Sequence, residues 1–348
     1  EATGEAELCS IEEPYLSSPP LKDEEHDRYE RPEKSAKSAA VLEHARAALE
    51  CCIHRGFGKH GLPYTGSGDW NDALDRVGGE SVWLGWFFAY CAARFAELLE
   101  RLGADGAAHY RQYAAEAGSA ADAAFNGKWY LRALYADGEA LGGGERIDSV
   151  AQSWAVLSDF GSETRAASAM DSALFRLWDR EHRLIRLLDP PYSDRESSPG
   201  YITGYGEGFR ENGGQYTHGA IWLAIAALRL GRSAEGTAML ETLLPETHEE
   251  RIYQAEPFVL PADISTARGH EGLAGWTWYT GSAGWYFRAV TRELLGLRMR
   301  DGRLYIESPV LPEFSVCWTD DAGRTHTIER SPDGITVDGK SYDGGGLP

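Results

Sequence analysis

Cysteine is scarce in this chain of 348 residues, and its ten histidines are scattered. The five cysteines form no CxxC pair. Their odd number, with one adjacent pair at Cys51 and Cys52, does not indicate a disulfide framework, so a reducing, cytoplasmic setting is expected. The histidines show no HxxxH or similar spacing. The sequence therefore predicts no metal site.

Basic residues are outnumbered by acidic ones, 34 against 54, which gives a formal net charge of −20. This balance argues against nucleic acid or an anionic membrane surface as a general partner. A neutral substrate fits better, and an anionic one needs local help. There is no run of 18 apolar residues and no signal-peptide pattern. The chain as given is therefore expected neither to span a membrane nor to direct its own export.

Hydrophobic residues make up 43% of the chain and aromatic residues 11%, enough for a large core. Some helical patterns are apolar around most of their circumference and others have one polar face, which is typical of concentric layers of helices. Apolar spacing predicts helices over residues 35–53, 81–102, 107–125, 149–157, 163–178, 215–230, 234–244 and 282–295.

Three regions follow from these patterns, and the fold class is mainly α. Residues 1–32 are charged and contain prolines, and we expect this segment to pack on the helical body. Residues 33–296 form that body. From Leu297 the apolar residues recur at every second position between DG and AG turns, which predicts a small antiparallel β appendage over residues 297–348.

One stretch, residues 61–80 (GLPYTGSGDWNDALDRVGGE), is too polar and too rich in glycine to be core. Its DWND tetrapeptide, residues 69–72, combines a flat ring that can stack on a pyranose, groups that hold hydroxyls, and a carboxyl for proton transfer. An ordinary surface turn has a similar composition. Two further glycine-rich aromatic loops, residues 204–218 and 275–285, favour a site over a turn.

Six motifs in fixed order resemble the catalytic region of glycoside hydrolase family 94: GSGDWND, ESVWLGW, DSVAQSWAVLS, PGYITGY, RENGGQYTHGAIW and GWTWYTGSAGW. This family comprises inverting glycoside phosphorylases and the C-terminal module of cyclic β-1,2-glucan synthases. The resemblance covers nearly the whole chain, and its N-terminal part looks most like the synthase and β-1,2-oligoglucan phosphorylase branch. It implies an (α/α)6 barrel, of which this chain supplies the later helices and the trailing β domain.

The resemblance also implies an activity. This is inverting phosphorolysis of β-linked gluco-oligosaccharides, with β-1,2-glucan favoured, to give α-glucose 1-phosphate. In such a reaction one carboxylic acid protonates the leaving oxygen, and phosphate is itself the nucleophile, so no general base is needed. No cofactor other than phosphate as co-substrate is expected. If the chain is part of a synthase, the expected location is the cytoplasmic face of the inner membrane.

Residue by residue, the match places the acid on Asp72, where a desolvated setting against Trp70 would raise the pKa of the carboxyl. Trp70 and Asp69 are assigned to the sugar. Asp69 also has a more structural expectation, to hydrogen-bond loop amides and hold the turn. Arg210 and Glu211 stand where the family has sugar-contacting residues, although Glu211 is also explained as a carboxylate paired with Arg210.

The phosphate is assigned to His218, Thr280, Gly281 and Ser282. A lone histidine near the start of an apolar helix is ordinarily a core residue, and only the RENGGQYTH context favours binding. A helix expected to begin near Ser282 offers free N–H groups and a dipole that bind anions. A plain N-cap is the alternative for Thr280 or Ser282, and both roles can coexist.

Four aromatic or amide residues are left outside the catalytic set. Gln152 and Trp154 recur in the family, but their helix is so apolar that packing is expected. Trp276 and Trp278 either wall the sugar site or fill core. The chain also departs from the family pattern, with Ala73 and Asp75 near the acid (DALDRVG for DGMNRVG) and Leu273 where arginine is common.

The family's phosphate site also draws arginines from an earlier part of the barrel that this sequence does not contain. We therefore expect a chain that is incomplete at its N-terminus. Its partner would be the missing part of the same polypeptide, or a second copy in a homodimer. Two other interpretations stay open: a non-catalytic piece of a larger synthase, and an inverting hydrolase, for which the matched motifs offer no general base.

Overall fold

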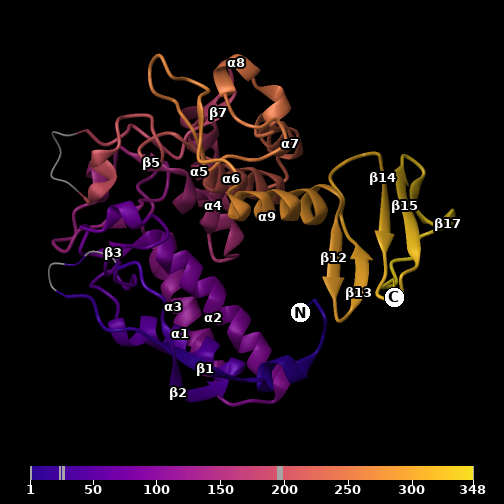
Figure 1. Ribbon diagram of the computed structural model, residues 1–348, viewed down its shortest axis with the longest axis horizontal. Helices are drawn as coiled ribbons and strands as arrows, with labels where there is room; N and C mark the ends of the chain where they lie inside the picture. The colour runs from indigo at the N-terminus through magenta and orange to yellow at the C-terminus, as the bar shows by residue number, and fades with distance from the viewer. Residues whose placement is uncertain (1, 23–24, 26–27, 194–198, 348) are drawn as a thin grey trace.

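The computed structural model, which describes residues 2–22, 25, 28–193 and 199–347, is built around an inner layer of helices (Figure 1). In this layer α2 contacts α4, α4 contacts α6 and α6 contacts α9. The last of them continues as the π-helical turn η6. The bounds are α2 (Val82–Leu102), α4 (Ser149–Leu157), α6 (Thr217–Arg229), α9 (Thr280–Arg288) and η6 (Ala289–Leu294).

An outer helix packs against each of the first three inner ones: α3 (Ala107–Ala123) against α2, α5 (Glu163–Arg176) against α4, and α7 (Ser233–Thr242) against α6. Helix α6 is buried along almost its whole length because apolar residues surround its axis. The outer helices α5 and α7 bury only part of theirs. The predicted arrangement of buried inner helices and half-exposed outer ones is confirmed.

The inner helices meet through tryptophan. Trp154 of α4 lies edge-on to Trp83 of α2 and to Trp222 of α6, with ring centroids 6.1 and 5.3 Å away. All three side chains are buried. Burying one large apolar side chain stabilises a fold by roughly 1.5 to 3 kcal/mol, so this cluster is a main source of stability for the inner layer.

Short strands precede three of the inner helices and pair antiparallel with later segments: β3 with β4, β5 with β8, and β9 with β10, which also pairs with β11. Strands β6 and β7 form a separate pair. Their bounds are β3 (Glu80–Ser81), β4 (Ala133–Leu134), β5 (Ile147–Asp148), β6 (Trp178–Asp179), β7 (Leu184–Ile185), β8 (Leu188–Asp189), β9 (Gln215–Tyr216), β10 (Asp263–Ile264) and β11 (Ala274–Gly275).

Short helical turns occupy the connections between these elements. They are η1 (Ala6–Ser10), η2 (Asp72–Leu74), η3 (Leu141–Gly144), η4 (Tyr201–Gly204), η5 (Pro245–Thr247) and α8 (Glu250–Tyr253). Two of them, η2 and η4, contact each other beside the DWND tetrapeptide.

The first predicted helix begins later than expected. Residues 33–40 form strand β2, paired antiparallel with β1 (Glu12–Ser17), and helix α1 begins at Val41 and ends at Arg55. The helical prediction for residues 35–40 was wrong because their small and polar side chains (SAKSAA) carry no strong period, and pairing with β1 decides the conformation. The hairpin also joins the N-terminal segment to the chain that follows it.

The C-terminal region is a β appendage reached through α9, set apart from the helices in Figure 1. Strands β12 (Leu297–Arg300) and β13 (Arg303–Ile306) form one hairpin. A four-stranded antiparallel sheet follows, with β14 (Phe314–Thr319), β15 (Thr325–Ser331), β16 (Gly334–Val337) and β17 (Lys340–Ser341). The hairpin and the sheet share one core, which includes the buried Leu304, Ile306 and Ile328. The period-two prediction is confirmed, with two sheets where one was expected.

Helix α2 is the one helix among the described residues that is long and apolar enough to cross a membrane by length and composition. Within its apolar window 56% of the residues are buried inside the protein. Core helices pass the same test, so this finding is weak evidence for a membrane span.

The packing of α3 can be tested at Gly118, because a Cβ there would lie 2.4 to 2.8 Å from Phe160. We expect Gly118→Ala to lower the free energy of unfolding by about 1 to 2 kcal/mol, since overpacking outweighs the gain in helix propensity. Gly284→Ala in α9 is the matched control, because nothing lies within 4 Å of its Cβ position. It should stabilise by about 0.5 to 1 kcal/mol. Thermal melts of both variants measure this, and an opposite order would contradict the packing.

Candidate active site

A cavity of about 570 Å³ gathers the three loops that the sequence singled out. Eight of the nine predicted site residues line it, together with Tyr216, Trp278 and Tyr279: Asp69, Trp70, Asp72, Glu211, His218, Thr280, Gly281 and Ser282. The ninth, Arg210, lies behind Glu211, with its Nε 3.4 Å from Oε2 of that carboxylate. Segments more than 200 residues apart in sequence therefore form one site.

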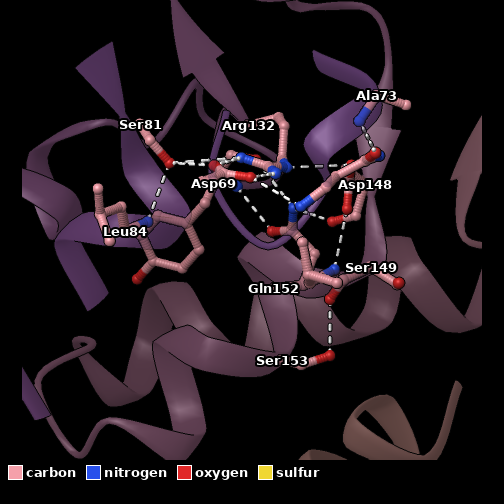
Figure 2. Close-up of polar contacts among 12 residues, drawn as sticks. Asp69, Ala73, Ser81, Leu84, Arg132, Asp148, Ser149, Gln152 and Ser153 are labelled. Carbon is pink, nitrogen blue, oxygen red and sulfur yellow. Dashed lines mark hydrogen bonds and ion pairs between the residues drawn. The ribbon is translucent and has the colours of Figure 1, made fainter. Parts of the chain in front are cut away.

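The DWND tetrapeptide is fixed in place by Arg132, a buried residue that the sequence analysis missed (Figure 2). Its Nη1 and Nη2 donate to the two carboxylate oxygens of Asp69 at 2.6 and 2.5 Å. Its Nε lies 3.3 Å from the carboxylate of Asp148. Asp148 caps α4 by accepting from Val150 N. Ser81, the N-cap of α2, donates to Asp69 at 2.6 Å. Arg132 thus ties the loop to the first turns of two inner helices.

The two carboxylates beside Arg132 are in different electrostatic situations. Burial acts to raise the pKa of Asp69, but the guanidinium and the hydrogen bonds from Arg132, Ser81 and Asn71 outweigh it and the pKa is lowered. Burial raises the pKa of Asp148 to about 6, because Arg132 only partly offsets it. Asp69 is therefore the ionised partner of Arg132, and Asp148 is the weaker one.

The same contacts correct the role predicted for Asp69. Its carboxylate accepts from Asn71 N, from the Ser81 hydroxyl and twice from Arg132. Although Asp69 lines the cavity, these donors saturate it, so the geometry favours positioning of the loop over sugar binding. The structural expectation for Asp69, which the sequence analysis gave beside the sugar assignment, fits these contacts.

Asp72 opens the short helix η2 and its side chain is exposed to the cavity. The expectation of a desolvated acid was wrong, because this side chain is exposed. Tyr201 lies close enough to Asp72 to interact with its carboxylate, and Asp75 accepts from the backbone N–H of Tyr201 at 3.0 Å. Asp75, which departs from the family pattern, thus fixes the neighbouring η4 turn. Gly200 allows this contact, since at its φ of +151° a Cβ would lie 2.2 Å from the carbonyl oxygen of Ala73.

The predicted sugar side of the cavity combines aromatic rings with charge. Trp70 is partly buried, with its ring centroid 5.4 Å from that of Tyr216 and 5.7 Å from that of His218. Glu211 is buried, and its Oε2 has no hydrogen-bond partner among the described residues. Such an acceptor can take a hydrogen bond from a sugar hydroxyl. Arg210 balances its charge and also lies 3.7 Å from Asp263.

Three residues at this side have positive φ angles although they are not glycine: Arg210 (48°), Trp276 (54°) and Trp278 (64°). Strained backbone of this kind persists where the surrounding structure enforces it and is common at binding sites. Trp276 lies under Arg210 at 4.8 Å, and Trp278 donates to Glu256 at 3.0 Å. Both tryptophans are about two-thirds exposed, so the core interpretation is wrong for them, and Trp278 is a cavity wall.

The predicted phosphate side presents hydrogen-bonding groups without partners. His218 lies in the first turn of α6, and its Nε2 is buried without a hydrogen-bond partner among the described residues. Burial lowers the pKa of His218 to about 4, so the ring is neutral near pH 7 and can donate one hydrogen bond. The buried hydroxyl of Ser282 also lacks a described partner. Both residues line the cavity.

Helix α9 begins at Thr280, two residues earlier than expected. Thr280, Gly281 and Ser282 therefore form its first turn, and Tyr279 is the N-cap, without a side-chain cap hydrogen bond. The N-cap alternative for Thr280 or Ser282 is wrong. Free N–H groups at a helix start attract anions, and no side chain caps them here.

Gln152 and Trp154 have the structural roles expected from the sequence, whereas Arg132 was not predicted. Gln152 exchanges hydrogen bonds with the backbone of Tyr130 at 2.8 Å and is buried, so its structural role is confirmed. Trp154 is part of the core. Arg132 carried one signal, a lone arginine in the apolar stretch WYLRALY, but its partner Asp69 lies 63 residues away.

Comparison with known proteins agrees with this geometry. Residues 3–296 match the Glycosyl hydrolase 94 superfamily, catalytic domain, whose fold is of the (α/α)6-barrel type. The chain belongs to this family. It is 38% identical to the cyclic beta-(1,2)-glucan synthase NdvB of Rhizobium meliloti (strain 1021), over 95% of this chain and 12% of that protein. It is 31% identical to solabiose phosphorylase of Paenibacillus borealis, over 74% of this chain and 35% of that one.

A third relative, N,N'-diacetylchitobiose phosphorylase of Vibrio proteolyticus, is 29% identical over 89% of this chain and 40% of its own length. The chain thus spans less than half of each of these three relatives. Solved structures show the fold alone: a sialidase superposes with a TM-score of 0.60 at 12% identity, over 86% of this chain and 30% of that one. A GH78 rhamnosidase of Bacillus sp. GL1 gives 0.58 at 14% identity, over 85% and 29%.

The charge state of Asp148 predicts a pH-dependent stability. Its pKa is raised from an unfolded value of about 3.9 to about 6, so between these values the folded chain holds a proton that the unfolded chain has released. Stability therefore falls as pH rises from about 4 to about 6. Asp148→Asn retains the N-cap oxygen and removes this loss.

The stability of Asp148→Asn relative to wild type should rise over that pH range, by on the order of 2 kcal/mol. Thermal or urea melts at several pH values measure the difference. Asp171→Asn, which removes an exposed aspartate, is the control, and the rise for Asp148→Asn should exceed any change seen in this control. A difference for Asp148→Asn that does not vary with pH would show that this carboxyl is ionised throughout.

Proposed function

We propose that this chain carries the catalytic centre of a glycoside phosphorylase. Its reaction would be inverting phosphorolysis of β-linked gluco-oligosaccharides, β-1,2-glucan first among them, to α-glucose 1-phosphate. The observation that carries the proposal is the content of one cavity. It holds an exposed carboxyl on one loop and, in the first turns of α6 and α9, the buried donors of His218 and Ser282, which have no hydrogen-bond partner among the described residues.

In the proposed mechanism Asp72 donates its proton to the glycosidic oxygen while the bond from that oxygen to the anomeric carbon breaks. A phosphate oxygen attacks the same carbon from the opposite face, which inverts its configuration. Trp70 offers a ring for stacking on the sugar, and Glu211 an acceptor for a hydroxyl. The products are α-glucose 1-phosphate and an oligosaccharide one glucose shorter.

In this proposal phosphate is held without a metal or other cofactor. His218 and Ser282 supply donors, and the first turn of α9, from Thr280, supplies N–H groups and the positive end of a helix dipole. A neutral histidine suits this task, because it donates a hydrogen bond at neutral pH without depending on a charge. In a chain with a net charge of −20, these groups supply the local positive potential and the hydrogen-bond donors that an anion requires.

The proposal extends to the larger assembly. The four inner helices and their outer partners would be the later part of an (α/α)6 barrel. Further barrel helices would come from other residues of the same polypeptide. Alternatively, a second copy of the chain would cover the side of the inner helices on which those further helices would pack. The 38% identity to a glucan synthase supports a place within such a synthase, in the cytoplasm or at the inner membrane. A non-catalytic role in the same assembly is the alternative.

Dependence on phosphate tests the proposal directly. The chain is incubated with β-1,2-gluco-oligosaccharides with and without inorganic phosphate, and the products are separated by anion-exchange chromatography. We expect α-glucose 1-phosphate only when phosphate is present. Free glucose formed equally well without phosphate would instead identify a hydrolase. No product under either condition would favour the non-catalytic alternative.

The assignment of the acid predicts a specific kinetic loss. Asp72→Asn keeps the size of the side chain and removes the proton donor, so kcat should fall by about 10² to 10⁴ while sugar binding is retained. Asp75→Asn, three residues away, is the matched control, because its amide oxygen can still accept from Tyr201. It should keep kcat within a few-fold. An equal loss of kcat in both variants would show that the loss comes from a change in loop geometry and not from the missing proton donor.

Asp69→Asn separates chemistry from positioning in the same tetrapeptide. It leaves Arg132 buried with only Asp148 as a charged partner, which costs about 3 to 5 kcal/mol by analogy with other broken buried pairs. We therefore expect a loss of thermal stability of the fold, which Asp72→Asn should not show. Circular dichroism melts of the two variants make the comparison. A stable Asp69→Asn protein with a lowered kcat would reverse the assignment of the acid.

A further inference from the structure

A second cavity, of about 600 Å³, lies at the other end of the inner helices, between them and strand β12. Five arginines line it against two carboxylates, those of Asp159 and Glu293. They come from five different elements: Arg94 (α2), Arg229 (α6), Arg288 (α9), Arg292 (η6) and Arg298 (β12). In a chain with 20 more acidic than basic residues, such a concentration of positive charge sets this cavity apart.

Two of the five arginines have a structural task. The carboxylate of Glu293 is buried and accepts from Arg229 Nη2 at 3.0 Å, while Nη2 of Arg298 lies 3.5 Å from its other oxygen. A buried carboxylate needs such partners, because an unpaired charge in the interior is costly. Arg229 and Arg298 are therefore already used to neutralise Glu293.

Arg288 and Arg94 are not used to neutralise Glu293. The guanidinium of Arg288 makes no hydrogen bond or ion pair with the described residues, and it lies 4.8 Å above the ring of Trp285. Arg94 pairs with Glu97 at 2.5 Å, but both side chains are more than 40% exposed. A guanidinium has five N–H donors, so Arg94 can bind an anion while it keeps this ion pair. The C-terminal end of α6 adds only about half a negative charge, so the cavity stays positive.

An adjoining cavity offers a surface for a ring. Tyr90, Arg229 and Arg288 also line this cavity of about 310 Å³, whose other walls include Trp222 and Trp285 and, toward the catalytic cavity, Trp70 and His218. A small anion on the arginines would therefore lie next to aromatic side chains. Both cavities have the size of small-molecule sites and are too small for a macromolecule.

We propose that the arginine-lined cavity binds a small phosphate-bearing anion, either inorganic phosphate or a phosphorylated sugar, at a site separate from the catalytic cavity. Guanidinium groups match phosphate oxygens in geometry and form charge-assisted hydrogen bonds with them. Arg288 and Arg94 would supply these bonds from two helices, and Arg229 and Arg298 would add charge while they hold Glu293.

The test measures binding, without sugar turnover, by calorimetric titration of this chain with inorganic phosphate and, in a second arm, with α-glucose 1-phosphate. Comparison of the arms separates the free ion from the sugar ester. The key variant is Arg94→Gln with Arg288→Gln, which leaves both partners of Glu293 in place. Arg300→Gln is the matched control, since Arg300 lies on β12, pairs with Glu307 and is not part of the cavity lining.

In a His218→Ala background, which weakens the catalytic phosphate site, we expect one equivalent to bind and the double variant to weaken it at least about tenfold, equal to 1.4 kcal/mol. In the wild-type background the double variant should lower the stoichiometry from two to one. Arg288→Lys keeps the charge without the planar fork and should give an intermediate loss. Thermal melts check that each variant is folded.

Two results would overturn the inference. One is binding that the double variant leaves unchanged. The other is an equal loss in the Arg300→Gln control, which would trace the binding to overall charge. Because no sugar is turned over, a failure of the phosphorolysis assay and a failure of this inference are seen in separate experiments.

Discussion

A single buried guanidinium holds the catalytic cavity in shape. Arg132 reaches Asp69 of the acid loop, and Asp69 and Arg132 together reach the residues that cap α2 and α4. Because these contacts are buried, water cannot substitute for them, and each has a nearly fixed geometry. The exposed Asp72, three residues after Asp69, therefore extends from a rigid base although its own loop is polar and rich in glycine. If Asp72 is the proton donor that we propose, rigidity of this kind would hold it in place for a substrate at little entropic cost.

The identities of the main helices followed from the sequence because their apolar residues are numerous and periodic. Helix α4 matches the predicted bounds, and α2 differs by one residue. Predictions failed where side chains are small or polar, as at residues 35–40, where a strand partner more than 20 residues earlier decides the structure. The start of α9 at Thr280 also depends on the tertiary structure, since no side chain there acts as an N-cap.

The site was predictable in its members and less so in their roles. Motif order brought eight of nine residues to one cavity, but local sequence does not reveal burial. Asp69 and Asp72 belong to one tetrapeptide, yet one is buried on Arg132 and the other is exposed. That difference depends on Arg132, which approaches Asp69 from a segment 63 residues away. Trp276 and Trp278 likewise stay outside the core because the backbone takes positive φ angles at both.

The direction of the inner helices explains how a strongly acidic chain can offer places for anions. The first turns of α6 and α9 reach the catalytic cavity, and the N-caps of α2 and α4 lie on the network beneath it. Each helix start carries about half a positive charge, so the four starts together add positive potential on this side. At their other ends the dipoles are negative, and arginines of α6 and α9 gather there. Helix direction thus supplies positive potential on one side and side chains supply it on the other, so neither cavity depends on the net charge of −20.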